Sequence, residues 1–213
     1  MVGAGLGGVM AIVLIEPGHS ERDISSGAPG EAALTWELAH RMEVQLAAAG
    51  VGSLLVRSWY RSDLPPPETF LTADIAIFLH FDAVFPATWR TGYFGDVRRL
   101  PGQSPNPQAV AFLDLWTALY ARLDIPHTPQ RRNANTWYYY AFHALEPRVP
   151  CVLLEHGVGQ GDDHALLFDR IDAVAAADSE AVLRYLGLWE NVTMPDPRIA
   201  ALEHALAQLA TDA

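Results

Sequence analysis

Residues 11–19, with the sequence AIVLIEPGH, begin with a short apolar run that ends at Pro17 and Gly18. An apolar run of this length, closed by turn residues, is typical of a buried strand that leads into a loop. Residues 31–49 follow with apolar side chains near helical spacing, and Gly50 comes directly after them as a natural helix end. The stretch therefore predicts a strand, a loop and a helix.

The same alternation continues along the chain. Strands are expected at 53–57, 75–81 and 151–154, a short helix at 68–72, and longer helices at 107–123 and 163–186. Strands that alternate with helices indicate an α/β domain with a central, mostly parallel sheet flanked by helices. Residues 91–100 fit an edge strand with a loop, and the aromatic stretch 133–142 fits no element clearly.

The domain organisation follows from the length of 213 residues and from the places where composition changes. We expect a flexible leader at 1–10, one folded domain at 11–187, and a linker with a C-terminal helix at 188–213. In that helix an apolar seam recurs at three- and four-residue spacing and consists of Ile199, Leu202, Leu206 and Leu209. The seam predicts docking on the chain's own domain or on the same helix of a second chain, as a homodimer.

Composition excludes several classes of function. The chain has 14 Lys and Arg against 25 Asp and Glu, a net charge of −11, so a nucleic-acid backbone would be repelled. No apolar run reaches the ~20 residues of a membrane span. A single cysteine excludes an internal disulfide. Residues 1–10 contain no Lys or Arg, unlike a secretory signal, which predicts a protein that is cytoplasmic when synthesised.

Four polar side chains lie where the predicted strands end or the first helix begins. They are His19 after the first strand, Glu31 at the helix start, His80 at the end of the third strand and Glu155 after the strand at 151–154. The carboxyl ends of parallel strands gather at one edge of a sheet, where ligands bind. Two histidines and a carboxylate suit a catalytic Zn²⁺, and a further carboxylate suits a general base. The first three are thus predicted metal ligands, and Glu155 the catalytic base.

Four blocks of sequence around these residues carry a family resemblance. They are IEPGH at 15–19, GAPGE at 27–31, ADIAIFLH at 73–80 and VPCVLLE at 149–155. In order and spacing they resemble the zinc-dependent N-acetylmuramoyl-L-alanine amidases (amidase type 3), which cut peptidoglycan. The chain departs from that pattern in three places: Glu16 stands where the family usually has Asp, Ser20 where it has Gly, and FLHFD at 78–82 where it has Ser-Ile-His-x-Asn.

The resemblance implies a specific reaction. The substrate would be peptidoglycan, and the bond would be the amide between the lactyl group of N-acetylmuramic acid and L-alanine. Zinc on His19, Glu31 and His80 would polarise the carbonyl and activate water, and Glu155 would pass the water proton to the leaving amine. Such an enzyme without an export signal would act on the cell wall after release, as a phage endolysin or as an autolysin.

Two other functions remain open from the sequence. One is a metal-free wall-binding module on the same fold, which would keep the groove but bind no zinc. Each site residue also has a structural alternative: a hydrogen-bonded histidine for His19 or His80, an acidic residue favoured by the helix dipole for Glu31, and a solvated turn residue for Glu155. The second function is a cysteine-dependent hydrolase that uses Cys151. Because Cys151 lies inside an apolar run, without the helix start or cationic neighbour that activates a thiol, the sequence favours a core position for it.

Other polar and aromatic residues are given structural roles. A surface or capping role is favoured over substrate contact for His143, His156 and His164. The aromatic cluster at 137–140 is expected to pack in the protein, with stacking on a sugar or peptide as the alternative.

Overall fold

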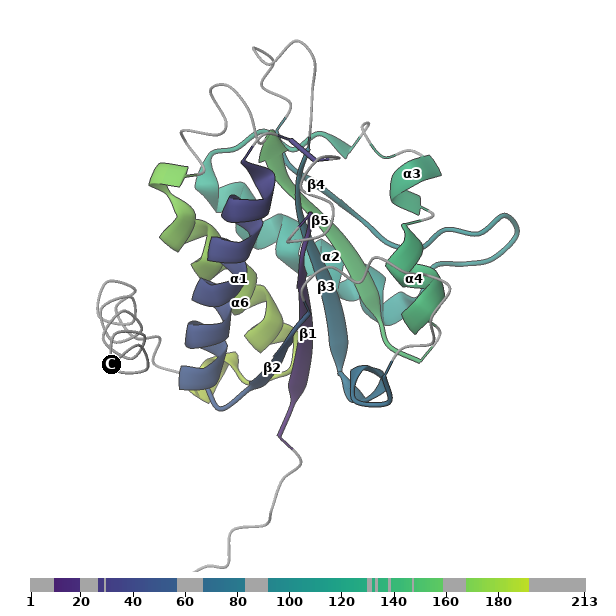
Figure 1. Ribbon diagram of the computed structural model, residues 1–213, viewed down its shortest axis with the longest axis horizontal. Coiled ribbons are helices and arrows are strands. Elements are labelled where there is room, and N and C mark those ends of the chain that lie inside the picture. The colour runs from purple at the N-terminus through teal and green to yellow at the C-terminus, as the bar shows by residue number, and fades with distance from the viewer. Residues whose placement is uncertain are drawn as a thin grey trace, which may run out of the picture.

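A five-stranded sheet lies at the centre of the protein (Figure 1). The computed structural model describes residues 10–19, 27–28, 30–56, 67–82, 92–129, 132, 134–137, 139–146, 148–158 and 168–191. Across the sheet the strands are β2 (Gly52–Leu55), β1 (Ile12–Pro17), β3 (Ile75–Asp82), β5 (Cys151–Val158) and β4 (Phe94–Asp96). All neighbouring strands are parallel except β4, which runs antiparallel to β5. The predicted α/β fold with a mostly parallel sheet is confirmed.

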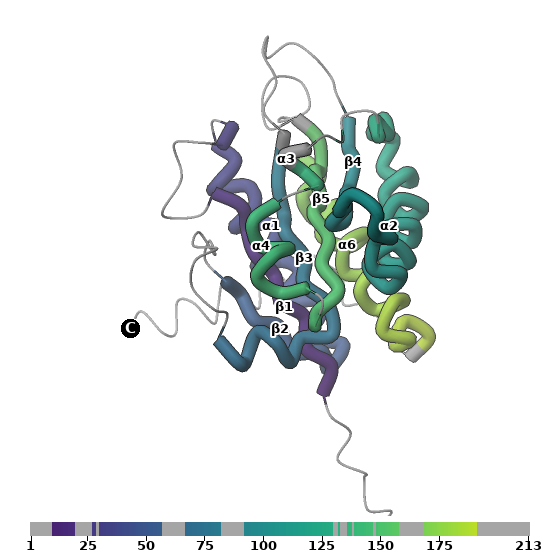
Figure 2. The backbone as a smooth tube through the Cα atoms, turned by 90° about the vertical axis from the view of Figure 1, so that its right-hand side faces the viewer, coloured from purple at the N-terminus to yellow at the C-terminus, as the bar shows by residue number. Residues whose placement is uncertain are grey.

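Helices bury both faces of this sheet. One face packs against the long helices α1 (Glu31–Ala48), α2 (Pro107–Tyr120) and α6 (Ile171–Tyr185). The opposite face carries the short helices α3 (Ala134–Trp137) and α4 (Tyr140–Leu145), which lie toward the viewer in Figure 2. Single 3-10 turns are η1 (Phe70–Thr72), η2 (Ala121–Leu123) and η4 (Trp189–Asn191). Along each strand, alternate side chains therefore enter two different cores.

Helix α1 shows how the apolar pattern determines the packing. Leu34, Leu38, Met42 and Leu46 recur every four residues, and each is at most 3% exposed. This spacing aligns them on one face of the helix, toward the sheet. The helix ends just before Gly50, whose φ of 76° lies in the left-handed region that glycine adopts without strain. The prediction of a helix at 31–49 is confirmed.

The strand expected at 151–154 is longer in the structure. Strand β5 continues to Val158 because its pairing with β3 continues there, at His80 with Glu155 and at Asp82 with Val158. Glu155 therefore lies inside a strand and is not a residue that follows one. The apolar run ends at Leu154, and the polar residues Glu155 and His156 that follow hide the rest of the strand from a pattern based on hydrophobicity.

The remaining elements agree with the sequence in kind. The edge strand expected within 91–100 is β4, and the helix expected at 107–123 is α2 followed by η2. The aromatic stretch that fitted no element forms α3 and α4. The two helices have only four and six residues and are therefore too short to show a helical period.

Parts of the predicted organisation lie outside the described residues. These are the leader, except for its last residue, and the C-terminal helix with its apolar seam. The homodimer through that helix stays a prediction. Among the helices that the structure does describe, none combines the length and the apolar character that crossing a membrane requires.

Candidate functional site

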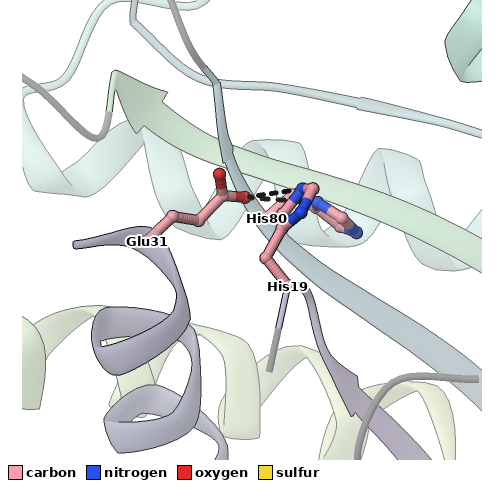
Figure 3. Close-up of side chains that lie close together, drawn as sticks. All are labelled: His19, Glu31 and His80. Atoms are coloured by element: carbon pink, nitrogen blue, oxygen red, sulfur yellow. Dashed lines mark ion pairs between the residues drawn. The ribbon is translucent and has the colours of Figure 1, made fainter. Parts of the chain in front are cut away.

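Three of the predicted site residues meet at the edge of the sheet where the parallel strands end. His19 follows β1, His80 lies near the end of the adjacent β3, and Glu31 is the first residue of α1 (Figure 3). One ligand atom from each of the three lies within 4.8 Å of the others. Because β1 and β3 are paired and parallel, their carboxyl ends bring the two histidines together.

The carboxylate of Glu31 is the centre of this cluster. Its Oε1 lies 3.3 Å from Nδ1 of His80 and 3.7 Å from Nε2 of His19. The two imidazole rings stand nearly perpendicular, with centroids 5.2 Å apart. Two imidazole nitrogens and one carboxylate oxygen thus face a common point, which is the donor set of a catalytic zinc site.

Main-chain groups fix the Glu31 carboxylate from both sides. The Phe81 N–H donates to Oε1 at 3.0 Å, and the Ala28 N–H donates to Oε2 at 2.8 Å. Burial alone would raise the pKa of Glu31, but His80, His19 and the Phe81 N–H outweigh it and hold the pKa below its ordinary value. Glu31 is 2% exposed and is therefore a buried, oriented carboxylate.

Two glycines make this close approach possible. A Cβ at Gly18 would lie 2.5 Å from Cε1 of His80, and a Cβ at Gly27 would lie 2.5 Å from Oε2 of Glu31. The turn at Gly18 is held on one side by its N–H bond to the Leu79 carbonyl and on the other by the Thr35 hydroxyl, both at 2.8 Å. Any larger side chain at either glycine would displace a residue of the site.

His19 itself has an uncommon backbone conformation. Its φ of 55° lies in the left-handed region, which costs a non-glycine residue about 1–3 kcal/mol. Glycine at this position would relieve the strain but would remove the imidazole. Strain of this kind is often found where a side chain must point into a functional site.

His80 has a partner that the sequence analysis missed. Its Nε2 lies 3.0 Å from the hydroxyl of Tyr139, just before α4. Burial, the charge of Glu16 and the proximity of Tyr140 raise the pKa of Tyr139 well above its ordinary value, so the phenol stays protonated. The aromatic cluster at 137–140 pointed to packing, which holds for Tyr139 against Phe78, but it gave no sign of this contact.

The predicted base lies next to the cluster and outside it. Glu155 pairs with His80 across β5 and β3, so both side chains leave the sheet on the same face. It is half-buried, and its charge acts on Tyr139. The structure thus brings all four predicted residues to one edge of the sheet and groups three of them as a possible metal site.

The surroundings of the other candidate residues decide whether they could take part in catalysis. Cys151 has no exposed surface, burial raises the pKa of its thiol well above the ordinary value, and the S–H donates to the Val149 carbonyl. The expected core position is confirmed, and a protonated, enclosed thiol is a poor nucleophile. His143 is exposed, as predicted, and His164 lies outside the described residues. For His156 the predicted surface or capping role is wrong, because its side chain is fully buried.

Comparison by sequence gave no relatives: neither a family model nor a curated protein matches the chain. Solved structures do match. An N-acetylmuramyl-L-alanine amidase of Mycobacterium smegmatis superposes with a TM-score of 0.62 and 18% identity, covering 83% of this chain and 97% of that one. The catalytic domain of an N-acetylmuramoyl-L-alanine amidase of Bacillus (Paenibacillus) polymyxa var. colistinus gives 0.60 and 18%, covering 84% and 99%.

A third similar structure is an N-acetylmuramoyl-L-alanine amidase of Clostridium difficile 630, with a TM-score of 0.61, 15% identity and coverage of 84% of this chain and 97% of that one. At such identities the likeness concerns the arrangement of the backbone. In each case the match extends over nearly the whole of the solved chain. The protein therefore has, over most of its length, the fold of N-acetylmuramoyl-L-alanine amidase catalytic domains.

Proposed function

We propose that this protein is a zinc-dependent N-acetylmuramoyl-L-alanine amidase, which hydrolyses the amide between N-acetylmuramic acid and L-alanine in peptidoglycan. The observation that carries the proposal is the grouping of His19, Glu31 and His80 within 4.8 Å at the carboxyl edge of an amidase-type fold. Action on the cell wall, as an endolysin or autolysin, is part of the same proposal.

The residues of the cluster fit a catalytic zinc site by their chemistry. Zn²⁺ would be held by His19, by Oε1 of Glu31 and by Nδ1 of His80, the atoms that face one another. Three protein ligands leave a position for water or substrate. A Zn²⁺ ion bound there supplies Lewis-acid chemistry, since it polarises a carbonyl group and lowers the pKa of water to about 7.

Tyr139 has a defined part in this site. When Nδ1 of His80 is a metal ligand, its Nε2 retains hydrogen and donates to the Tyr139 hydroxyl, 3.0 Å away. Such an outer partner sets the tautomer of a ligating histidine and keeps the ring in its plane. A protonated phenol can accept this bond without adding negative charge near the carboxylates.

Glu155 is proposed as the general base. It takes the proton of the attacking water and delivers it to the nitrogen of the leaving L-alanine, so that the amide C–N bond breaks with the amine neutral. Its place beside His80, one strand away, supports this role, because strands are spaced by only about 4.8 Å. It lies near the metal ligands without belonging to their cluster.

Product analysis on purified peptidoglycan tests the proposal. An amidase releases new L-alanine amino termini and no new reducing sugar ends, and a chelator should stop the release until Zn²⁺ is added back. Cuts inside the stem peptide would make the protein a peptidase. Binding to the wall without products would favour the metal-free module, and activity that resists chelator but not thiol alkylation would favour Cys151.

A further inference from the structure

A buried polar network lies behind the candidate site, on the side of the sheet covered by the long helices. His156 Nε2 lies 2.8 Å from Oδ2 of Asp178 on α6, and Trp116 Nε1 donates to Oδ1 of Asp178 at 2.6 Å. The Tyr120 hydroxyl donates to the main-chain carbonyl of His156 at 2.9 Å. All four residues have no exposed surface, so this network is closed to solvent.

The network reaches the candidate ligand His80 through its main chain. Nδ1 of His156 lies 3.2 Å from the carbonyl oxygen of His80. A carbonyl oxygen only accepts, so Nδ1 is the donor, while Nε2 faces the Asp178 carboxylate. The ring therefore joins a carboxylate on α6 to the backbone of the candidate ligand on β3.

The contact falls where the sheet is irregular. After the pair of His80 with Glu155, the next pair is Asp82 with Val158, so β5 contains one extra residue at this point. His156 lies within that bulge. Bulges are common beside active sites, where they redirect side chains and interrupt the regular ladder. Here a side chain supplies a hydrogen bond to the strand at the place where the register changes.

Stability alone is a weak reason for such an arrangement. Desolvation offsets much of the attraction in a buried ion pair, and well-packed apolar side chains often stabilise a core equally well. What His156 and Asp178 add is direction, since each hydrogen bond restricts the orientation of its partner.

We propose that His156, oriented by Asp178, is a positioning residue for the metal site. It fixes the main chain of His80 from the interior of the protein, and thereby the direction in which His80 presents Nδ1 to Glu31. Tyr139 holds the outer end of the same imidazole. The ligand is thus fixed at two points, and loss of either allows it to turn away. This inference rests on the proposed zinc site.

Two substitutions of His156 separate positioning from stability. In His156→Asn the amide nitrogen takes the place of Nδ1 and can still donate to the His80 carbonyl, but the bond to Asp178 is lost. In His156→Gln the longer side chain can reach Asp178 in place of Nε2, but the donor to His80 is lost. The matched control is Ser179→Ala, because Ser179 follows Asp178 on α6 and is, like Asp178, fully buried.

The readouts are the zinc dissociation constant, from competition with a chromophoric chelator, and the thermal midpoint of the metal-free protein. We expect His156→Gln to raise the zinc dissociation constant at least roughly 10-fold, the usual effect of removing a hydrogen bond that orients a metal ligand. His156→Asn should bind zinc within about threefold of wild type, although Oδ2 of Asp178 loses its contact with His156 and only the Trp116 bond to Oδ1 remains, which should lower the midpoint more. Ser179→Ala should leave zinc binding unchanged.

A folded His156→Gln protein with wild-type zinc affinity would overturn the positioning role, as would a loss of affinity that merely follows the loss of stability across both variants. Should His156→Gln not fold, His156→Leu tests the same link, because its apolar side chain also lacks a donor for the His80 carbonyl. It should weaken zinc binding at least roughly threefold, and unchanged affinity would refute the role. A wild-type protein that binds no zinc would overturn the zinc site itself, a distinct result.

Discussion

His80 on β3 and Glu155 on β5 are direct neighbours across the sheet, because they occupy paired positions in two parallel strands. Their side chains leave the same face, at a strand spacing of about 4.8 Å. A candidate metal ligand and a candidate base are therefore held at a separation that the hydrogen-bond ladder determines. The fold, more than any local motif, places the two groups side by side.

Glu155→Gln should separate chemistry from metal binding. The amide keeps the size of the side chain but cannot take up a proton, so hydrolysis of peptidoglycan should fall by about 10²–10⁴-fold. Zinc affinity should be unchanged, because Glu155 lies outside the three-residue cluster. Exposed Glu68 offers a control, Glu68→Gln, which should keep full activity. Near-native turnover in the Glu155 variant would exclude the base role, and loss of zinc would make Glu155 a ligand.

Gly18→Ala should damage the site by steric overlap. The new methyl group would lie 2.7 Å from both Nδ1 of His80 and the carbonyl of Leu79, and the backbone atom cannot move aside cheaply. We expect zinc affinity to fall at least roughly 10-fold in a protein that still folds. In the control Gly52→Ala, the nearest atom is the flexible end of Met10 at 3.2 Å, and zinc titration should match wild type. Equal affinity for both variants would contradict the steric account.

Tyr139→Phe should weaken metal binding without changing the ligands. The substitution removes the acceptor for Nε2 of His80 and keeps the ring that packs against Phe78. Because a metal ligand loses its hydrogen-bond partner, the zinc dissociation constant should rise by roughly 10-fold. Isothermal titration of the two proteins measures this directly. An unchanged constant would show that the contact does not orient His80.

Glu146, which is not one of the candidate site residues, should make the stability of the protein depend on pH. Burial raises its pKa to about 7 from an ordinary value of 4.5, although Arg98 and the Cys151 N–H lower it. A raised carboxyl pKa means that the folded state holds the proton more tightly. The stability it contributes is therefore complete below about pH 4.5 and is lost as the pH rises to about 7.

Glu146→Gln removes this titration. The variant should be more stable than wild type at about pH 8, by roughly 1–3 kcal/mol, and close to wild type at about pH 5. Urea unfolding at the two pH values gives the difference. A variant that is less stable than wild type at the higher pH would show that the ion pair of Glu146 with Arg98 outweighs the cost of burying the charge.

The sequence was most informative where function and local pattern coincide. His19, Glu31 and His80 follow or begin regular elements, so the rule that parallel strands end at one edge was enough to group them. The apolar period of α1 likewise predicted its bounds closely. The ends of strands and the apolar period of a helix are determined by residues close together in the sequence, so both can be predicted from the sequence.

Contacts between distant segments could not be predicted in this way. Tyr139 meets His80 across 59 residues, and His156 meets the His80 carbonyl across 76. Neither pair has a periodic signal, and a histidine beside an acidic residue reads as a surface residue. The extra residue that β5 carries after Glu155 is seen only in its pairing with β3, so no pattern within one segment could reveal it.

Metal analysis of the purified protein tests the central claim most directly. Wild type should hold one equivalent of zinc per chain, released by chelator, and His80→Ala should hold none, because it removes one of the three clustered donors. His143→Ala, which changes an exposed histidine on α4, should still hold one equivalent. A wild-type protein that takes up no zinc, or a His80→Ala protein that keeps a full equivalent, would contradict the account.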